Sequence, residues 1–249
     1  MRHASFIVNA DDYGRDEEST QAILECFKHG FVHRTTLMVN MVYSGEAVDL
    51  SRKYAIFDKV GLHLNLTQGR PLTEGIRAFA EFCDDAGCFK THLVGCPGYP
   101  LTTAMKRAVS EEVRAQARQY LAFGFPLKHC DGHHHVHARL GLYPIVIPIL
   151  QELGFRSIRN RYTVFGPLWR GVRGRLLKFK YERIVWNHGL KTTAAFGGWN
   201  GESLDKWQRF GSVELMVHPH YDVTGNLINV TDFRQMMGPR MEGLCVHQS

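Results

Sequence analysis

The segment Phe6-Ile7-Val8-Asn9-Ala10-Asp11-Asp12-Tyr13-Gly14 gives the first indication of the fold. Three β-prone apolar residues precede two adjacent carboxylates and a glycine, which is typical of a buried strand that delivers Asp11 and Asp12 at its carboxyl end. Residues 16–29 follow with apolar side chains at helical spacing, acids in the first turn and a glycine at the stop position. A strand followed by a helix predicts the repeating unit of an α/β protein.

The same alternation continues along the chain. We expect strands at residues 6–8, 35–40, 59–66, 127–131, 156–159 and 213–217, and helices at residues 16–29, 44–54, 103–124, 143–153, 172–181 and 203–210. Residues 67–100 and 187–201 are rich in glycine and other breakers and have the composition of loops. The order of elements predicts an α/β fold with parallel strands, either a barrel or an open sheet.

Composition limits the class of protein. A chain of 249 residues with 44% hydrophobic and 22% charged residues fits one globular domain over residues 1–249. No segment has the apolar length of a membrane span, and the amino terminus lacks the pattern of a secretory signal, so we expect a cytoplasmic protein. The six cysteines show no CxxC spacing and are expected to be reduced thiols.

The formal charge of +6 is unevenly distributed. Between Arg156 and Arg183 there are nine cations and one acid, Glu182, and the same region contains Leu176, Phe179 and other apolar side chains. Such a block suits an anionic partner. Charge runs are usually solvated faces, which is the first interpretation here, and peripheral contact with an acidic membrane is the alternative. We expect no nucleic acid, and a homodimer is a further expectation.

Histidines are concentrated in the middle of the chain. The stretch from Lys128 to His137 contains five of the fourteen histidines. Neutral imidazoles bind divalent metals, so this density predicts a metal site, with a polar loop as the alternative. In an extended segment His133, His135 and His137 would share one face, so their spacing alone does not identify a ligand.

Polar residues also follow the other predicted strands. Asp11 and Asp12 end the first strand, His63 lies in the third, and His218 follows the last. Carboxyl ends of parallel strands converge on one mouth, so these side chains are expected near the histidine cluster. One carboxylate and two imidazoles can hold a divalent metal, and a second aspartate is then free to act as a base.

The motifs resemble those of the YdjC-like carbohydrate deacetylases, also called the chito-oligosaccharide deacetylase family. They occur in the family's order and are Asn9-Ala10-Asp11-Asp12-Tyr13-Gly14, Gly61-Leu62-His63-Leu64-Asn65, Asp131-Gly132-His133-His134-His135-Val136-His137 and Val217-His218-Pro219. The family pattern commonly has Asp-Ser in place of Asp131-Gly132 and Phe in place of Tyr13. Neither difference removes a metal-binding group.

The resemblance implies a distorted (β/α) TIM-like barrel that holds one divalent ion, Mg²⁺ or Zn²⁺. Carried over by position, the metal ligands are Asp12, His63 and His133, with Asp11 as general base and His218 as general acid. The implied reaction is hydrolysis of the N-acetyl group of an amino sugar, either in an oligosaccharide or in a lipid-linked glycan. Further substrate contacts are expected from Tyr13, His135, His137, Arg159 and Trp199.

Two other functions are compatible with the same residues. A metal-dependent phosphoesterase on a similar barrel would use aspartates and histidines at strand ends, and the basic segment would suit phosphate. Such sites usually hold two or three metals and need more carboxylates. A non-catalytic metal-binding protein would use the histidines without turnover.

Overall fold

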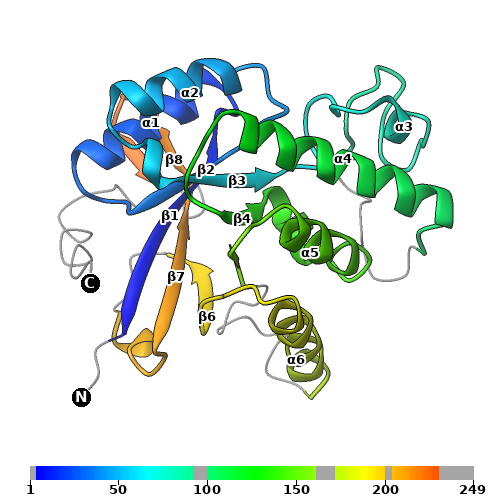
Figure 1. Ribbon diagram of the computed structural model, residues 1–249. Helices are drawn as coiled ribbons and strands as arrows, with labels where there is room; N and C mark the ends of the chain where they lie inside the picture. The colour runs from blue at the N-terminus through cyan, green and yellow to red at the C-terminus, as the bar shows by residue number, and fades with distance from the viewer. Residues whose placement is uncertain (1–3, 92–99, 161–171, 200–203, 230–249) are drawn as a thin grey trace.

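The computed structural model describes residues 4–91, 100–160, 172–199 and 204–229, in which seven parallel strands form a curled sheet (Figure 1). The strand order is β5-β4-β3-β2-β1-β7-β6, so β1 lies near the centre of the sheet. The strands are β1 (Ser5–Tyr13), β2 (Arg34–Leu37), β3 (Val60–Leu64), β4 (His129–Gly132), β5 (Ser157–Ile158), β6 (Ala195–Gly198) and β7 (Ser212–Val217). The sheet forms half of a barrel, which confirms the predicted distorted, barrel-like α/β fold.

Helices pack along the outside of the curled sheet (Figure 1). They are α1 (Glu17–Lys28), α2 (Ser44–Lys53), the short α3 (Glu74–Arg77), α4 (Thr103–Ala122), α5 (Tyr143–Glu152) and α6 (Val172–Asn187). Side-chain caps fix the starts of the two predicted helices with the clearest apolar stripes: Asp16 accepts from the backbone N–H of Ser19 at α1, and Thr102 accepts from that of Met105 at α4. The predicted α/β alternation is therefore present.

Residues 187–201 contain β6, so the prediction of a loop there was wrong for Ala195–Gly198. The segment Ala-Phe-Gly-Gly has little local β signal, and it becomes a strand because it pairs with β7 in register from Ala195 with Val213 onward. Glycine is required at Gly197, because a Cβ there would lie 2.4 Å from the Trp207 ring. Trp207 can therefore pack directly on the edge strand.

The helix predicted at residues 203–210 is a single 3-10 turn, Leu204–Trp207, within the described residues. Residues 200–203 lie outside the described ranges, as do residues 92–99 of the predicted loop and residues 161–171 of the basic segment. After β7 the chain forms an antiparallel hairpin of β8 (Pro219–Tyr221) and β9 (Leu227–Asn229). In the described part of the chain, no helix has both the length and the apolar character that a membrane span requires.

The two faces of the central strands differ in chemistry. On β1, Val8 and Ala10 are buried among apolar side chains, whereas Asn9 and Asp11 alternate with them and are also buried. Polar side chains from other strands, or from the segments that follow them, contact Asn9 or Asp11; they include Thr36, Asp131 and Arg159. The inside of the half-barrel is therefore a buried polar layer beneath the carboxyl ends of the strands.

Candidate metal centre

Two adjacent carboxylates at the end of β1 face the same pocket. In a regular strand neighbouring side chains point to opposite faces. Here the register of β1 against β2 shifts between Ala10 and Tyr13, and Asp12 has φ of 72°, in the left-handed region. Because of this irregularity both Asp11 and Asp12 line the pocket, although each is almost fully buried.

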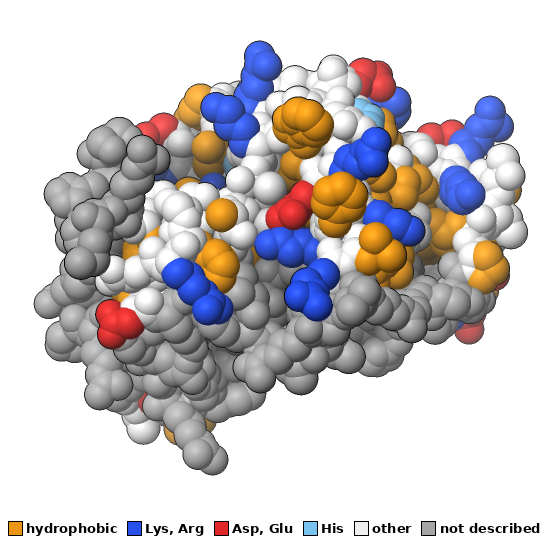
Figure 2. Space-filling model, turned by 90° about the horizontal axis from the view of Figure 1, so that it is seen from below, with side chains coloured by type: hydrophobic (Ala, Val, Ile, Leu, Met, Phe, Trp, Pro, Cys, Tyr) orange, Lys and Arg blue, Asp and Glu red, His pale blue; other side chains and the backbone are white. Residues whose placement is uncertain are grey.

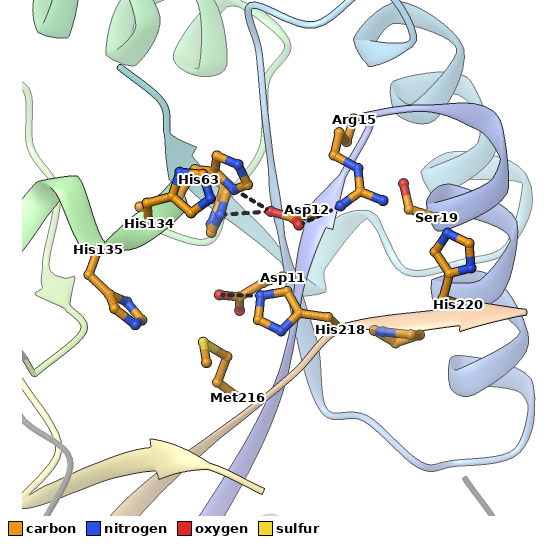
Figure 3. A pocket seen from close by; sticks show the side chains of 13 residues that line it. Asp11, Asp12, Arg15, Ser19, His63, His134, His135, Met216, His218 and His220 are labelled. Atoms are coloured by element: carbon orange, nitrogen blue, oxygen red, sulfur yellow. Dashed lines mark hydrogen bonds and ion pairs between the residues drawn. The ribbon is translucent and has the colours of Figure 1, made fainter. Parts of the chain in front are cut away.

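Two imidazoles approach the carboxylate of Asp12 (Figure 3). His133 Nδ1 lies 2.8 Å from Asp12 Oδ1, and His63 Nε2 lies 3.1 Å from the same oxygen. The other oxygen, Oδ2, accepts a hydrogen bond from Arg15 at 2.9 Å. Ligand atoms of Asp12, His63 and His133 all lie within 4.8 Å of one another.

The turn after β4 determines which histidine of the cluster contacts Asp12. His134 and His135 have φ of 49° and 56°, so residues 133–138 form a kinked 3-10 turn and not the extended segment assumed from the sequence. As a result His133 points to Asp12, His134 lies 3.0 Å from the Thr67 hydroxyl, and His135 faces the pocket from another side. His137 is fully buried and does not line the pocket.

The donor set fits a divalent ion. One carboxylate oxygen and two imidazole nitrogens match the three protein ligands of many catalytic zinc sites, which leave a position for water or substrate. His63 holds its other nitrogen, Nδ1, 2.7 Å from Asp131 Oδ1, the arrangement that commonly orients a metal-binding imidazole. Its Nε2 is buried and has no hydrogen-bond partner of good geometry among the residues that the structure describes.

Electrostatics keep the two aspartates ionised. Burial opposes the charged form of Asp12, but the hydrogen bond with His133 and the charges of His133 and His63 outweigh it and hold its pKa well below the usual range. Burial likewise opposes ionisation of Asp11, and the guanidinium of Arg159 more than compensates, so the pKa of Asp11 is also lowered. For His63, the carboxylates of Asp131 and Asp12 overcome burial and raise the pKa to about 10.

Asp11 lies next to this group without sharing its ligand atoms. Arg159 donates to both of its oxygens at 2.6 Å, and Asn9 donates to Oδ1 at 2.7 Å. His218, which follows β7, places Nε2 4.0 Å from Asp11 Oδ2, and its side chain is 28% exposed. The five residues expected from the strand ends therefore lie together around one pocket (Figure 3).

The pocket is a cavity of about 770 Å³ at the carboxyl ends of the strands. Its lining adds residues that the sequence analysis missed, namely Arg15, Ser19, His134, Met216, Pro219 and His220. The sequence did indicate part of this set. Met216, His218 and His220 are two residues apart, and side chains at this spacing in an extended segment lie on the same face.

Four residues expected to contact substrate are buried and lie outside the pocket lining. Tyr13 donates its hydroxyl to the Ala47 carbonyl at 2.8 Å, and Trp199 is 6% exposed. Arg159 and His137 are fully buried. Of the five residues expected to contact substrate, only His135 lines the cavity. For the other four, substrate contact stays a prediction that their burial does not support.

The fold and the site define an α/β half-barrel protein with a carboxylate and imidazole centre at the carboxyl ends of its strands. The chain matches the model of the YdjC-like protein family over residues 5–244. It therefore belongs to the YdjC-like family.

Curated relatives carry related names. A carbohydrate deacetylase of Vibrio cholerae is 31% identical over 86% of this chain and 78% of that protein. A carbohydrate deacetylase of Brevibacillus brevis is 36% identical over 59% of this chain, and the match spans only 55% of that relative's length. A chitooligosaccharide deacetylase of Yersinia pestis is 34% identical over 64% of this chain and 60% of that protein.

One solved structure is similar in fold. It comes from Enterococcus faecalis, and its description names cellobiose-phosphate cleavage as a provisional role. The TM-score is 0.68 with 21% identity, over 89% of this chain and 83% of the other. At this identity the similarity supports the fold alone.

Proposed function

We propose that this protein is a metal-dependent carbohydrate deacetylase that hydrolyses the N-acetyl group of an amino sugar, and that residues 1–249 form one domain. The observation that carries the proposal is the approach of His63 and His133 to one oxygen of Asp12, at 3.1 and 2.8 Å, in a pocket that Asp11 and His218 also line. The names of the curated relatives support the same reaction.

Asp12, His63 and His133 would hold the ion, for which Zn²⁺ or Mg²⁺ are the candidates. A divalent ion at such a site supplies a Lewis acid that polarises a carbonyl and makes water easier to deprotonate near neutral pH. Two nitrogen ligands favour Zn²⁺ over Mg²⁺, which prefers oxygen.

Asp11 and His218 would move the protons of the reaction. Asp11 is ionised and held by Arg159 and Asn9, so its carboxylate can accept the proton of the attacking water. His218 lies beside it, and its backbone N–H donates to Asn229 Oδ1 at 2.9 Å, which fixes the residue at the pocket wall. A proton from His218 would allow the nitrogen of the sugar to leave as a neutral amine.

The arrangement of charges argues against the phosphoesterase alternative. Such enzymes usually bind two or more metals, and two further groups of potential ligands exist here, Asp11-His63-Asp131 and His129-Asp131-Glu214. The carboxylates in both groups are already bound by Arg159 at 2.6 Å. Arg15 binds Asp12 as well, but it contacts only the oxygen Oδ2 and no other member of that group. Among the three groups found in the described residues, therefore, only the one around Asp12 has no arginine that bridges two of its members, which supports a single-metal hydrolase.

The experiment compares acetate and phosphate release from matched N-acetylated and phosphorylated sugars, with and without chelator. We expect acetate release that chelator abolishes. His133→Ala should lose metal and activity, Asp11→Asn should keep metal and lose activity, and His29→Ala, at an exposed histidine, should keep both. Full metal occupancy and activity in His133→Ala would contradict the ligand assignment. Phosphate release without acetate release would favour the rival enzyme, and metal binding without turnover would favour a binding protein.

A peripheral contact with an acidic membrane is supported by α6. Leu176, Phe179 and Trp186 are 51%, 59% and 78% exposed on this helix. Figure 2 shows hydrophobic and basic side chains side by side on the face of the molecule that includes α6. The exposed cations of α6 include Lys180 and Arg183. Apolar and cationic side chains together match an anionic lipid surface.

Arg161 and Arg170 of the basic segment, and the side chain of Arg173, lie outside the described residues. The cytoplasmic location and the homodimer stay predictions from the sequence.

A further inference from the structure

Arg159 is fully buried beneath the pocket and contacts three carboxylates. Its Nε lies 2.6 Å from Glu214 Oε1. One terminal nitrogen lies 2.6 Å from Asp11 Oδ2, and the other lies 2.6 Å from both Asp11 Oδ1 and Asp131 Oδ2. All three nitrogens of the guanidinium therefore contact carboxylate side chains of the protein.

The contact with Asp131 extends to the candidate metal centre. Asp131 turns its other oxygen, Oδ1, to His63 Nδ1 at 2.7 Å. A carboxylate at that distance favours a proton on Nδ1, which leaves Nε2 to face Asp12. Arg159 thus contacts Asp11 directly and acts on His63 through one intermediate side chain.

The geometry requires a fork of donors and not only a positive charge. Asp11 receives two parallel N–H bonds, and one of the two nitrogens is shared with Asp131, which fixes the distance between the two carboxylates. A lysine ammonium is a point charge and cannot reproduce three separate directions. Asn9 and Thr36 also donate to Asp131 Oδ2, at 3.3 and 3.0 Å, so this oxygen is held from several sides.

We propose that Arg159 is a positioning residue, which fixes the carboxylate of Asp11 and, through Asp131, the ring nitrogen that His63 presents to the metal. The inference rests on the proposed function for the roles of Asp11 and His63. It replaces the expectation that Arg159 binds substrate, because a buried side chain with this set of partners does not line the cavity.

The first variant is Arg159→Lys, which keeps the charge and removes the fork. We expect metal affinity and kcat each to fall by about 10- to 100-fold, as for other groups that orient metal ligands, with little change in KM. The matched control is Arg114→Lys. Arg114 donates to both oxygens of Glu152 at 2.7 Å, so this variant removes the same kind of fork from a carboxylate outside the pocket lining. This control should retain the wild-type metal affinity and kcat.

The second variant, Asp131→Asn, separates the contact of Arg159 with Asp11 (the Asp11 arm) from its link to His63 through Asp131 (the His63 arm). It also tests the inference if Arg159→Lys does not fold. It breaks the link to His63 and leaves Arg159 on Asp11, so we expect weaker metal binding and a smaller loss of kcat at saturating metal. Metal binding is measured by calorimetry with Zn²⁺ on the apo protein. In the Zn²⁺-loaded protein, the ring ¹⁵N chemical shifts of His63 report whether Nδ1 carries the proton and Nε2 is free to bind the ion. This tautomer is expected in the wild type and should be lost in Asp131→Asn.

The outcomes distinguish this inference from the proposed function. If the wild type binds Zn²⁺ but releases no acetate, the deacetylase proposal fails, and the affinity and the ¹⁵N shifts still test the His63 arm. If Arg159→Lys lowers only the melting temperature and keeps kcat and metal affinity, Arg159 has a structural role and the inference is overturned. An unchanged His63 tautomer and metal affinity in Asp131→Asn would overturn the His63 arm. A rise in KM alone in Arg159→Lys would restore a substrate-binding role.

Discussion

At the scale of single residues, the backbone of Asp12 explains how one strand end supplies two functional carboxylates. Left-handed φ values are rare for residues with a side chain, and asparagine and aspartate tolerate them best. Asp12, His134 and His135 all have positive φ, and all three line the pocket. Backbone strain of about 1–3 kcal/mol per residue often accumulates at functional sites, where the surrounding structure maintains it.

Asp12→Asn is predicted to remove the metal without unfolding the protein. Asparagine has the same shape and tolerates the left-handed backbone, so the apo variant should fold. It should melt below the apo wild type, because it lacks the charge that pairs with His63, His133 and Arg15. An ion at 100 times its Kd stabilises a folded protein by about 2.7 kcal/mol, and the variant should lose this gain. Thermal melts with and without Zn²⁺ measure this stabilisation in the wild type and in the variant.

Asp12→Ala is the matched comparison for the backbone. It should also lose the metal, and it should be less stable than Asp12→Asn by about 1–2 kcal/mol, because alanine is disfavoured in the left-handed region. Equal stabilisation by Zn²⁺ in the wild type and in Asp12→Asn would refute the assignment of Asp12 as a ligand.

The sequence placed Asp11, Asp12, His63, His133 and His218 at strand ends, and the structure brings these side chains together. This was possible because parallel strands converge at their carboxyl ends whatever their order. The spacing of the clustered histidines did not identify the ligand, since this depends on the kinked turn after β4, and the choice of His133 came from the family resemblance. Nor could the place of Arg159, whose partner Asp11 is 148 residues away in sequence.

At the scale of elements, the amphipathic helices were predictable and the edge strand β6 was not. The periodicity of α1 and α4 is a local property of each segment, and both helices lie within the predicted ranges. The two-residue strand β5 also lies within a predicted strand range. By contrast, β6 contains two glycines and forms by pairing with β7, so its local sequence carries little signal.

Gly132→Ala tests how tightly the turn after β4 is packed. A Cβ at Gly132 would lie 2.9 Å from the Leu64 carbonyl oxygen and 3.1 Å from His137 Nδ1. We expect a loss of stability of about 1–3 kcal/mol, as for other overpacked sites, together with weaker metal binding because His133 follows directly. Urea unfolding and Zn²⁺ calorimetry measure the two effects.

Gly45→Ala provides the control for this substitution. Gly45 lies in α2 with nothing within 4 Å of its added Cβ, so alanine there should stabilise the protein by about 0.4–1 kcal/mol. The family motif commonly has serine at the position of Gly132, and the close approach of the Leu64 carbonyl predicts that Gly132→Ser is also unfavourable in this chain. A neutral effect of Gly132→Ala would show that the turn can relax.

The exposed face of α6 gives a second prediction at this scale. We expect binding to vesicles that contain phosphatidylserine and no binding to neutral vesicles. Each cation near such a surface contributes about 1 kcal/mol, so Lys180→Ala with Arg183→Ala should weaken binding by roughly 30-fold at low salt. Vesicle cosedimentation measures the affinity of each variant for the vesicles.

Matched apolar substitutions test whether α6 itself makes the contact. Phe179→Ala with Trp186→Ala should weaken binding to the anionic vesicles, whereas Val42→Ala with Val223→Ala, at exposed valines elsewhere, should not. Equal binding of both double variants, or no binding of the wild type at low salt, would remove the membrane from the list of partners.

At the scale of the whole molecule, buried ion pairs hold the inside of the half-barrel. Asp11 of β1, Asp131 of β4 and Glu214 of β7 all contact Arg159, which follows β5. Arg34 of β2 contacts Glu214 as well. The class of fold was predictable from the alternation of elements, but this interior was not, since its charged residues are scattered along the chain and meet only when the sheet curls.

Stability at acid pH should report on this interior through Glu214. Burial opposes ionisation of Glu214, and the guanidinium groups of Arg34 and Arg159 outweigh it and lower its pKa to about 2. A carboxylate whose pKa is lowered on folding stabilises the protein above its unfolded pKa of about 4.3, and this contribution disappears as the pH falls from there to about 2. Glu214 should therefore contribute on the order of 3 kcal/mol at neutral pH.

We expect Glu214→Gln to be less stable than the wild type at pH 7 and to lose less stability between pH 4.5 and pH 2. Urea unfolding at a series of pH values measures both slopes. Glu74→Gln removes a glutamate that is 83% exposed and should change neither the stability at pH 7 nor the slope by more than about 0.5 kcal/mol. Parallel curves for the wild type and Glu214→Gln would mean that the two arginines do not hold this carboxylate ionised, and the buried ionic layer would then not account for acid unfolding.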